Sequence, residues 1–392
     1  MDFRFSEDEE KFGEEVRDFL KRELTSEFIG QLEVKPIEER DYSPEFTRKL
    51  GERGWIGVGW PKEYGGQGRS RMEQFIFARE LLYHRAPIEA NVLGMNIVGP
   101  SLINFGSEEH KKEYLPRILK GKIVFCLGYT EPGAGSDLAS MQTRAEEEGD
   151  DYVINGQKTL ISIARHADFC WLGARTDPTA PKKHRGISLF IVDMKTPGIT
   201  VRPVWTMANM RVDDIFFDEV RVPKSALVGE KNRGFYHIAT ALDHERVFMG
   251  ALVAAHRRIL DELIEYAKQT RHNGYPLSKE PLVRHKLAEL AIEVKVGEAL
   301  AYRLVWMSSK GAVPFHEASI SKVFTSELEQ RLTNIGMQVM GLYGQLKEDS
   351  KWAQLKGRME YMCRFAILGT IGGGTNEIQR TIIALMGLGL PR

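Results

Sequence analysis

The sequence predicts an α+β protein with a helical segment at each end and a segment of closely spaced strands between them. Residues 1–122 and the chain from Gly234 onward place apolar side chains every three or four positions, the period of an amphipathic helix. Between them, runs such as FCWLGA, ISLFIVDM and IFFDEVRVP follow one another without a long helix, which favours an antiparallel sandwich or barrel. A chain of 392 residues also exceeds the size at which one hydrophobic core usually stops growing.

The pattern predicts three domains: an N-terminal helical domain over 1–122, a middle β-domain over 123–231 and a C-terminal helical domain over 232–392. Helices of the first domain are expected over 10–24, 44–54, 72–84 and 108–120. Helices of the last domain are expected over 235–270, 281–310, 315–341 and 350–369, followed by a final helix that Thr375 caps. Within the β-domain, Asn155-Gly156 predicts a hairpin turn, because both residues tolerate positive φ.

Composition and charge argue against several classes of protein. Lys+Arg and Asp+Glu number 54 each, so there is no basic excess for nucleic acid or an anionic membrane. Every apolar run is shorter than the ~20 residues that a membrane span needs. The three cysteines are too few and too scattered for a disulfide framework, which favours a cytoplasmic protein. The histidines lack metal-ligand spacing, and no GxGxxG opens a helix, so neither a metal site nor a Rossmann site is expected.

A carboxylate on the inward face of the helix from 235 is the leading catalytic candidate. Ile238, Leu242, Glu245, Met249 and Leu252 follow one another in steps of four, three, four and three, which places them on one stripe. An inward carboxylate is costly unless it is paired or hydrogen-bonded. Two interpretations follow: a structural ion pair, or a general base whose pKa burial raises towards neutrality.

Two glycine-rich segments are the leading candidates for binding. YTEPGAGSDLAS at 129–140 follows an expected strand and combines the hydroxyls of Thr130 and Ser136 with glycines that let the backbone approach a ligand. LGTIGGGTNEIQR at 368–380 places three glycines before an expected helix start, whose free N–H groups suit an anion. Each pattern alone is also typical of an ordinary polar loop or a glycine-linked helix.

Taken together, these segments resemble the acyl-CoA dehydrogenase family. YTEPGAGSD is similar to the first signature of that family and GGGTNEIQR to the second, while GDDYVINGQKTLISIARHADFCWLGART and FFDEVRVPKSALVGEKNRGF match it in order and spacing. The resemblance covers essentially the whole chain. It implies an N-terminal helical domain, a middle antiparallel β-domain and a C-terminal four-helix bundle. It also implies an enzyme that uses FAD to oxidise an acyl-CoA thioester to trans-2-enoyl-CoA and passes electrons to an electron-transfer flavoprotein.

The resemblance implies where FAD binds. Residues 127–136 would line the flavin, and residues 160–162 would meet the isoalloxazine, with the Ser162 hydroxyl near N5. The family often has tryptophan where this chain has Leu160. Gln338 to Leu342 would reach the ADP half of a neighbour's FAD. The implied cofactor-binding residues are Leu127, Tyr129, Thr130, Gly135, Ser136, Leu160, Ile161, Ser162, Gln338, Gly341, Thr375, Asn376 and Glu377.

Members of the family differ in which residue supplies the catalytic base. Many carry a glutamate directly before the GT of the second signature, where this chain has Gly373. Isovaleryl- and long-chain-type members take the base from the inward face of the earlier helix, directly before an arginine, and that position is Glu245, followed by Arg246. The resemblance and the helical stripe therefore select the same residue.

The implied substrate-binding residues are Ser136, Asp243, Arg246 and Gly373. Gly373 would offer its backbone N–H to the thioester carbonyl. A small residue at this position widens the acyl pocket, which favours a branched or bulky acyl group.

Three departures from the family concern assembly. Many members contact a neighbour's FAD through arginine, phenylalanine and glutamine where this chain has Thr270, Asn273 and Pro281. Such gaps resemble members that assemble as α2β2 heterotetramers, and GWPKEYGGQGRS, KKHRGIS and DHERV resemble the base-carrying chain of actinobacterial steroid side-chain dehydrogenases. A homotetramer is the family default. Two other interpretations stay open: a subunit that is inactive without a partner chain, and a flavin oxidase or monooxygenase on this scaffold.

Overall fold

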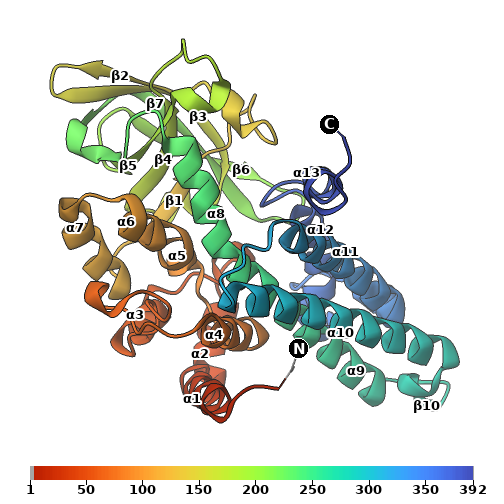
Figure 1. Cartoon of the computed structure of the whole chain (residues 1–392). Helices are drawn as coiled ribbons and strands as arrows, with labels where there is room; N and C mark the ends of the chain where they lie inside the picture. The colour runs from red at the N-terminus through yellow and green to blue at the C-terminus, as the bar shows by residue number, and fades with distance from the viewer. Residues whose placement is uncertain (1–3, 392) are drawn as a thin grey trace. The chain divides into compact units, whose positions relative to one another are not determined.

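The computed structural model describes residues 4–391, apart from the side chains of residues 241–247 and 249. Its contacts divide the chain into two compact units (Figure 1). The sheet unit comprises Glu23–Arg69 and Pro87–Glu245. The helical unit comprises the N-terminal residues up to Arg22, Ser70–Ala86 and the chain from Arg246 onward. The N-terminal helices are therefore shared between the two units, and one boundary falls inside helix α8.

One mixed sheet forms the centre of the sheet unit. Its strands are β1 (Phe125–Gly128), β2 (Arg144–Glu148), β3 (Asp151–Ile161), β4 (Phe169–Arg175), β5 (Ile187–Asp193), β6 (Ile199–Trp205), β7 (Arg211–Pro223) and β8 (Leu227–Val228). They lie in the order β6-β7-β3-β2-β4-β5-β8, with β1 beside β4. Most neighbours are antiparallel, as predicted, whereas β1 and β2 each pair with β4 in parallel. Alternate residues of β4, including Cys170 and Leu172, point into one apolar core.

Short helices complete the sheet unit. They are α2 (Ser26–Glu33), α3 (Pro44–Glu52), α5 (Glu89–Leu93), α6 (Gly99–Phe105), α7 (Glu108–Leu119) and the first part of α8 (Gly234–Ala251). The predicted helices over 44–54 and 108–120 are confirmed, and serines start both: the Ser43 hydroxyl accepts from Phe46 N, and the Ser107 hydroxyl from His110 N. A π-helical turn at Gly94–Val98 joins α5 to α6.

The predicted hairpin at Asn155-Gly156 is wrong. β3 passes through both residues, and its pairing with β7 shifts register between Ile154 and Gly156 as a β-bulge. The Asn155 amide bonds across the strands instead, since its Nδ2 donates to Glu219 Oε1 at 2.6 Å and its Oδ1 accepts from Glu219 N at 2.9 Å. These tertiary bonds outweigh the local turn preference. The hairpin between β2 and β3 lies earlier, at Gly149, which has a φ of 61°.

Packed helices form the helical unit. They are α1 (Glu7–Glu23), α4 (Arg71–Tyr83), α9 (Val253–Gln269), α10 (Pro281–Ser309), α11 (Phe315–Met340), α12 (Arg358–Gly369) and α13 (Asn376–Ile382). A short hairpin of β9 (Arg271–His272) and β10 (Tyr275–Pro276) joins α9 to α10. Figure 1 shows α9, α10 and α11 running alongside one another, and Leu263, Leu290 and Leu328 from these helices meet in one core. No helix within the described residues is both long enough and apolar enough to cross a membrane.

Two predicted C-terminal helices differ from the structure at their ends. The helix expected over 235–270 is divided into α8 and α9 by a turn at Leu252, whose φ of −56° and ψ of −26° keep the chain close to helical. The helix expected over 350–369 begins only at Arg358, because Leu355 and Lys356 adopt left-handed φ values of 49° and 55°. The remaining expected helices appear within a few residues of their predicted bounds.

Glu262 on α9 joins three elements of the helical unit. Arg85 donates two hydrogen bonds to its carboxylate, each 2.8 Å long, while Arg258 donates at 3.0 Å and Arg358 at 2.8 Å. Burial opposes ionisation of Glu262, but these arginines outweigh burial and lower its pKa to about 2. The carboxylate therefore stays charged and fastens the end of α4 and the start of α12 to α9.

We expect Glu262→Gln to destabilise the protein in a pH-dependent way. The folded pKa of about 2 lies below the unfolded value of about 4.3, so the stabilisation is fully present above about pH 4.3 and is lost as pH falls towards 2. Thermal unfolding of wild type and variant should differ by about 3 kcal/mol at pH 7 and by roughly half of that at pH 3. The exposed Glu265→Gln on the same helix is the control. A pH-independent difference for Glu262→Gln would contradict this account.

A second prediction concerns the stability cost of adding a side chain at the bulge in β3. Gly156 has a φ of 151°, and a Cβ added there would lie 2.6 Å from Thr143 Oγ1 and 2.7 Å from Thr143 Cα. Gly156→Ala should therefore lower the free energy of unfolding by about 2–3 kcal/mol, because both backbone and neighbour must move. Gly149→Ala, at a φ of 61° with open space, should cost only about 1 kcal/mol. Urea unfolding followed by circular dichroism compares the two, and equal costs would refute the steric argument.

Candidate active site

The loop between β1 and β2 forms a closed turn beside the end of β3. Glu131 and Ala134 exchange two backbone hydrogen bonds, of 3.1 and 3.0 Å, and the N–H of Thr159 donates to Thr130 O at 2.9 Å. Nothing lies within 4 Å of a Cβ added at Gly133 or Gly135. The outer surface of this loop therefore includes accessible backbone at Gly133 and Gly135, beside the exposed Pro132, Ser136 and Asp137.

The residues expected to line a flavin from this loop have different exposures. Tyr129 is buried, Leu127 and Thr130 are half-buried, and Gly135 and Ser136 are exposed. Thr130 is tied through its carbonyl to β3, so the loop and the end of β3 lie side by side. Thr130 and Ser136 therefore both have accessible side chains that carry hydroxyls.

The end of β3 presents an apolar side chain to solvent. Leu160 has a left-handed φ of 57° and is 56% exposed, whereas Ile161 is buried and Ser162 is exposed. A positive φ in a branched apolar residue is rare and indicates a constraint from the surrounding structure. The buried Asp213 carboxylate supplies one constraint nearby, because it accepts from Arg211 Nε at 2.7 Å and from the N–H of Arg165 at 3.2 Å.

Helix α8 begins against the same part of the sheet. Ile238 is buried. Its Cδ1 and the Cε of Met141, which belongs to the loop, each lie 3.4 Å from the position that a Cβ would occupy at Gly173 on β4. Phe235 packs on Ala134 and Met141 of that loop. The inward stripe predicted for this helix is therefore buried at Ile238. Leu242, Asp243, Glu245, Arg246 and Met249 lie further along α8, and their side chains lie outside the described residues.

In the helical unit, the three glycines connect α12 to α13. Gly373 and Gly374 adopt left-handed φ values of 66° and 85°, and nothing lies within 4 Å of a Cβ added at Gly373. The Gly373 carbonyl accepts from Gln379 Nε2 at 3.2 Å. Among the described groups none accepts from its N–H. A residue with a side chain would be strained here, so glycine leaves an accessible backbone amide and open space.

Thr375 and Asn376 hold the start of α13. The Thr375 hydroxyl accepts from Ile378 N at 3.3 Å, which confirms the predicted N-cap. The Asn376 side chain is buried: its Oδ1 accepts from Lys322 Nζ at 2.7 Å, and its Nδ2 donates to Ser326 Oγ at 3.1 Å and to Glu327 Oε1 at 3.2 Å. Because both ends of the amide are engaged within the protein, only the backbone of Asn376 can serve a cofactor.

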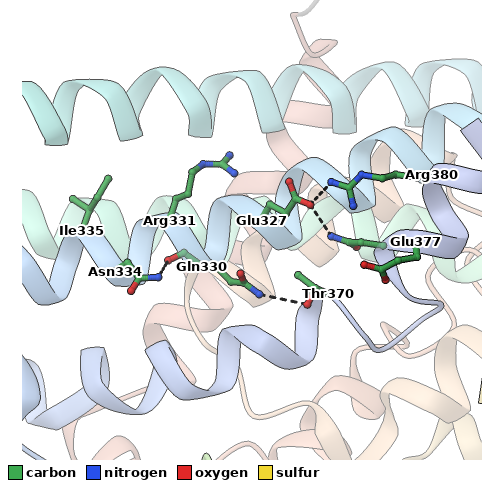
Figure 2. A pocket seen from close by; sticks show the side chains of 9 residues that line it. Glu327, Gln330, Arg331, Asn334, Ile335, Thr370, Glu377 and Arg380 are labelled. Carbon is green, nitrogen blue, oxygen red and sulfur yellow. Dashed lines mark hydrogen bonds and ion pairs between the residues drawn. The ribbon is translucent and has the colours of Figure 1, made fainter.

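A polar groove of about 560 Å³ lies between α11, the end of α12 and α13 (Figure 2). Its wall includes Glu327, which accepts from Arg380 at 2.6 Å, and Gln330, whose Nε2 donates to Thr370 Oγ1 at 3.4 Å. The hydrogen bond from Arg380, against the opposing effect of burial, lowers the pKa of Glu327. Asn376 and Glu377 line the groove as well. Two predicted cofactor residues thus face one accessible, nearly neutral depression.

Gln338 and Gly341 lie apart from this groove at the end of α11. Gln338 is exposed and accepts from Lys286 Nζ at 2.5 Å, and Gly341 is exposed with a left-handed φ of 60°. The next residue, Leu342, is 82% exposed. This end of α11 therefore offers polar and apolar groups at the surface of the helical unit.

The fold and these segments agree with a known family. The sequence matches the acyl-CoA dehydrogenase N-terminal domain over residues 6–122, the middle domain over 126–220 and the C-terminal domain over 232–387. The chain belongs to the acyl-CoA dehydrogenase family. The resemblance seen in the sequence is thereby confirmed, and so is the mixed architecture of a β-domain between helical domains.

Several relatives of this acyl-CoA dehydrogenase cover its full length. The acyl-CoA dehydrogenase FadE26 of Mycobacterium tuberculosis is 39% identical, over 100% of this chain and 99% of the relative. Two solved structures, a Tcur3481-Tcur3483 steroid ACAD and the ChsE4-ChsE5 complex from Mycobacterium tuberculosis, have TM-scores of 0.92 and 0.91. Each is 38% identical over 100% of both chains.

The residues of the sheet unit fit the FAD that acyl-CoA dehydrogenases use. A flavin ring needs an apolar surface for its faces and hydrogen-bonding groups at its polar edge. Leu160 supplies an exposed apolar side chain, and Thr130, Ser136 and Ser162 supply accessible hydroxyls. The open glycines allow the backbone to approach a planar group closely. An aliphatic rather than an aromatic side chain stands at position 160.

Sequence reasoning missed the buried polar groups that support this surface. Lys158 is fully buried and its Nζ donates to Glu131 Oε1 at 2.8 Å, while Asp213 fixes the turn after β3. The sequence carried no clear signal for this burial, since Lys158 stands between Gln157 and Thr159 and the strand is buried in an irregular pattern. The partner of Lys158 could not be predicted from local sequence, because Glu131 lies 27 residues earlier in the chain.

The network around Asn376 gives a prediction for the helical unit. Asn376→Ala should lower the free energy of unfolding by about 1–3 kcal/mol, because it leaves the buried Ser326 hydroxyl and the half-buried Lys322 and Glu327 groups without their common partner. Asn334→Ala, at an exposed position on the wall of the same groove, should change it by less than about 0.5 kcal/mol. If thermal unfolding gave both variants the same loss of unfolding free energy, the hydrogen bonds of Asn376 would not stabilise the helical unit as argued.

Proposed function

We propose that this enzyme dehydrogenates a branched or bulky acyl-CoA between Cα and Cβ with Glu245 as the base. Gly373 is the observation that supports this most directly. The position where many family members carry the basic glutamate is a glycine with a φ of 66°, open space and an accessible N–H. Position 373 therefore carries no carboxylate, and in this proposal Glu245 of α8 supplies the base instead.

In this proposal each residue has a defined role. The N–H of Gly373 donates to the thioester carbonyl and stabilises the negative charge that develops on its oxygen. Polarising the carbonyl in this way acidifies the α-carbon, and the Glu245 carboxylate removes the α-proton. FAD, when bound, accepts the β-hydrogen as hydride. Thr130, Ser136 and Ser162 orient the cofactor, and Ser136, Asp243 and Arg246 lie along the acyl-CoA.

The acyl group is proposed to be bulky for two reasons. Glycine at position 373 removes a side chain from the pocket, and a solved relative of 38% identity is described as a steroid ACAD. The natural electron acceptor is proposed to be an electron-transfer flavoprotein. Rapid formation of peroxide without such an acceptor would instead favour an oxidase.

Glu245→Gln tests the base. The variant should keep its FAD spectrum but lose at least about 100-fold in turnover, because general base catalysis typically contributes that much or more. Glu265→Gln, an exposed carboxylate on α9, is the control and should turn over like wild type. The assay is anaerobic bleaching of the flavin with steroid-bearing, isovaleryl-, butyryl- and octanoyl-CoA. Near-wild-type turnover by Glu245→Gln would refute its role, and a preference for the straight short chains would refute the bulky pocket.

A partner chain is a second part of the proposal. Two solved relatives are named as complexes of two different chains, Tcur3481-Tcur3483 and ChsE4-ChsE5. Thr270 and Asn273 of this chain lie at the exposed β9–β10 hairpin, where Asn273 has a φ of 51°, and Pro281 starts α10. We propose an α2β2 assembly, with a homotetramer as the alternative. Native mass and FAD stoichiometry, with and without a co-expressed acyl-CoA dehydrogenase-like chain, distinguish the two.

A further inference from the structure

We propose that Lys158 is a positioning residue, whose buried ammonium holds in place both backbone segments that face the flavin. This inference rests on the proposed function, because it assumes that FAD binds at the loop after β1 and at the end of β3. Lys158 is buried and has three partners around its ammonium, none of which is a proposed catalytic group.

Lys158 contacts the flavin-facing loop at several points. Its side chain is fully buried, and Nζ donates to the Tyr129 carbonyl at 3.1 Å and to Glu131 Oε1 at 2.8 Å, with Met141 Sδ at 3.9 Å. Burial lowers the pKa of Lys158, and the Glu131 carboxylate opposes that effect. A buried ammonium must keep such partners, so the loop is held where the lysine places it.

Glu131 extends this connection to the far end of the loop. Its Oε2 accepts from the N–H of Gln142 at 2.5 Å, and its Oε1 accepts from the N–H of Thr143 at 2.9 Å. Burial opposes ionisation of Glu131, but Lys158 and these two amides outweigh burial and lower its pKa. The Lys158–Glu131 ion pair therefore holds both ends of the loop formed by residues 129–143.

The same lysine fixes the second segment. Lys158 belongs to β3 and stands two residues before Leu160, and the next N–H, of Thr159, donates to Thr130 O at 2.9 Å. The loop and the end of β3 are thus connected by a side chain and by a backbone hydrogen bond at adjacent positions. Met141, beside Nζ, also packs against the start of α8 near Ile238 and Phe235. The ammonium therefore lies where the loop, β3 and α8 meet.

Stability alone does not account for this arrangement. A buried ion pair can often be replaced by apolar side chains of similar volume without loss of stability, because desolvation of two charges is expensive. The ion pair instead fixes the orientation of backbone groups, namely the Tyr129 carbonyl and the N–H groups of Gln142 and Thr143. An apolar contact would leave these groups free to shift. Such directional control is what a site for a planar, hydrogen-bonding cofactor requires.

The test uses the full chain with Lys158→Met, Glu131→Gln and the double variant. The double variant removes both charges and keeps side chains of similar size, so it is the one expected to fold if Lys158→Met does not. Arg221→Met is the matched control, because Arg221 forms an exposed ion pair with Glu148 between β7 and β2, at 2.8 Å. The readouts are the FAD dissociation constant, the flavin midpoint potential, and hydrogen exchange at the amides of residues 142 and 143.

The double variant should melt, as apoprotein, within a few degrees of wild type. Its amides at 142 and 143 should exchange at least tenfold faster, its FAD dissociation constant should rise at least tenfold, and its midpoint potential should shift. Arg221→Met should match wild type in all three. An unchanged FAD dissociation constant and potential in the folded double variant would overturn the inference, whether or not exchange is faster. Wild-type protein that binds no FAD would instead overturn the proposed function on which the inference rests.

Discussion

A charge buried beneath the candidate cofactor surface is the constraint on which the sheet unit depends. Lys158 is on the inward side of β3, where water cannot solvate its ammonium. The ammonium donates hydrogen bonds to the Glu131 carboxylate and the Tyr129 carbonyl, both from the loop after β1. Because Glu131 in turn accepts two backbone N–H groups, the ion pair restrains both ends of a glycine-containing loop, while Arg175 donates to the Ala139 and Met141 carbonyls between them.

In the helical unit, a buried side-chain amide rather than an ion pair anchors a glycine-rich segment. Three glycines between α12 and α13 give the backbone freedom, and the buried amide of Asn376 removes that freedom again by engaging Lys322, Ser326 and Glu327. The accessible N–H of Gly373 is thus presented by a loop whose position is set one turn away. In both units, a glycine-rich backbone segment of the proposed site is anchored by a buried polar side chain whose polar atoms are engaged within the protein.

Family membership and the chemistry of individual positions carry different information. The match along the whole chain identifies an acyl-CoA dehydrogenase, but it leaves the acyl group open. Two positions of this chain, a glycine at 373 and a leucine at 160, provide open space and an exposed aliphatic side chain where the resemblance implies a carboxylate and a tryptophan in many members. In the proposed function, the glycine at 373 leaves room for a larger acyl group and assigns proton removal to Glu245 of α8.

The sequence by itself determined the order of helices and strands, the family, and local features such as the Thr375 cap, because these depend on periodicity and on residues close together in the chain. It misassigned Asn155-Gly156, since the bonds to Glu219 that convert a turn signal into a bulge come from a strand far along the chain. Only the tertiary structure revealed the Lys158–Glu131 pair, the internal use of the Asn376 amide and the left-handed Leu160. The physical reason is the same in each case: burial and long-range partners decide what a polar or strained residue does, and neither is encoded in its immediate neighbours.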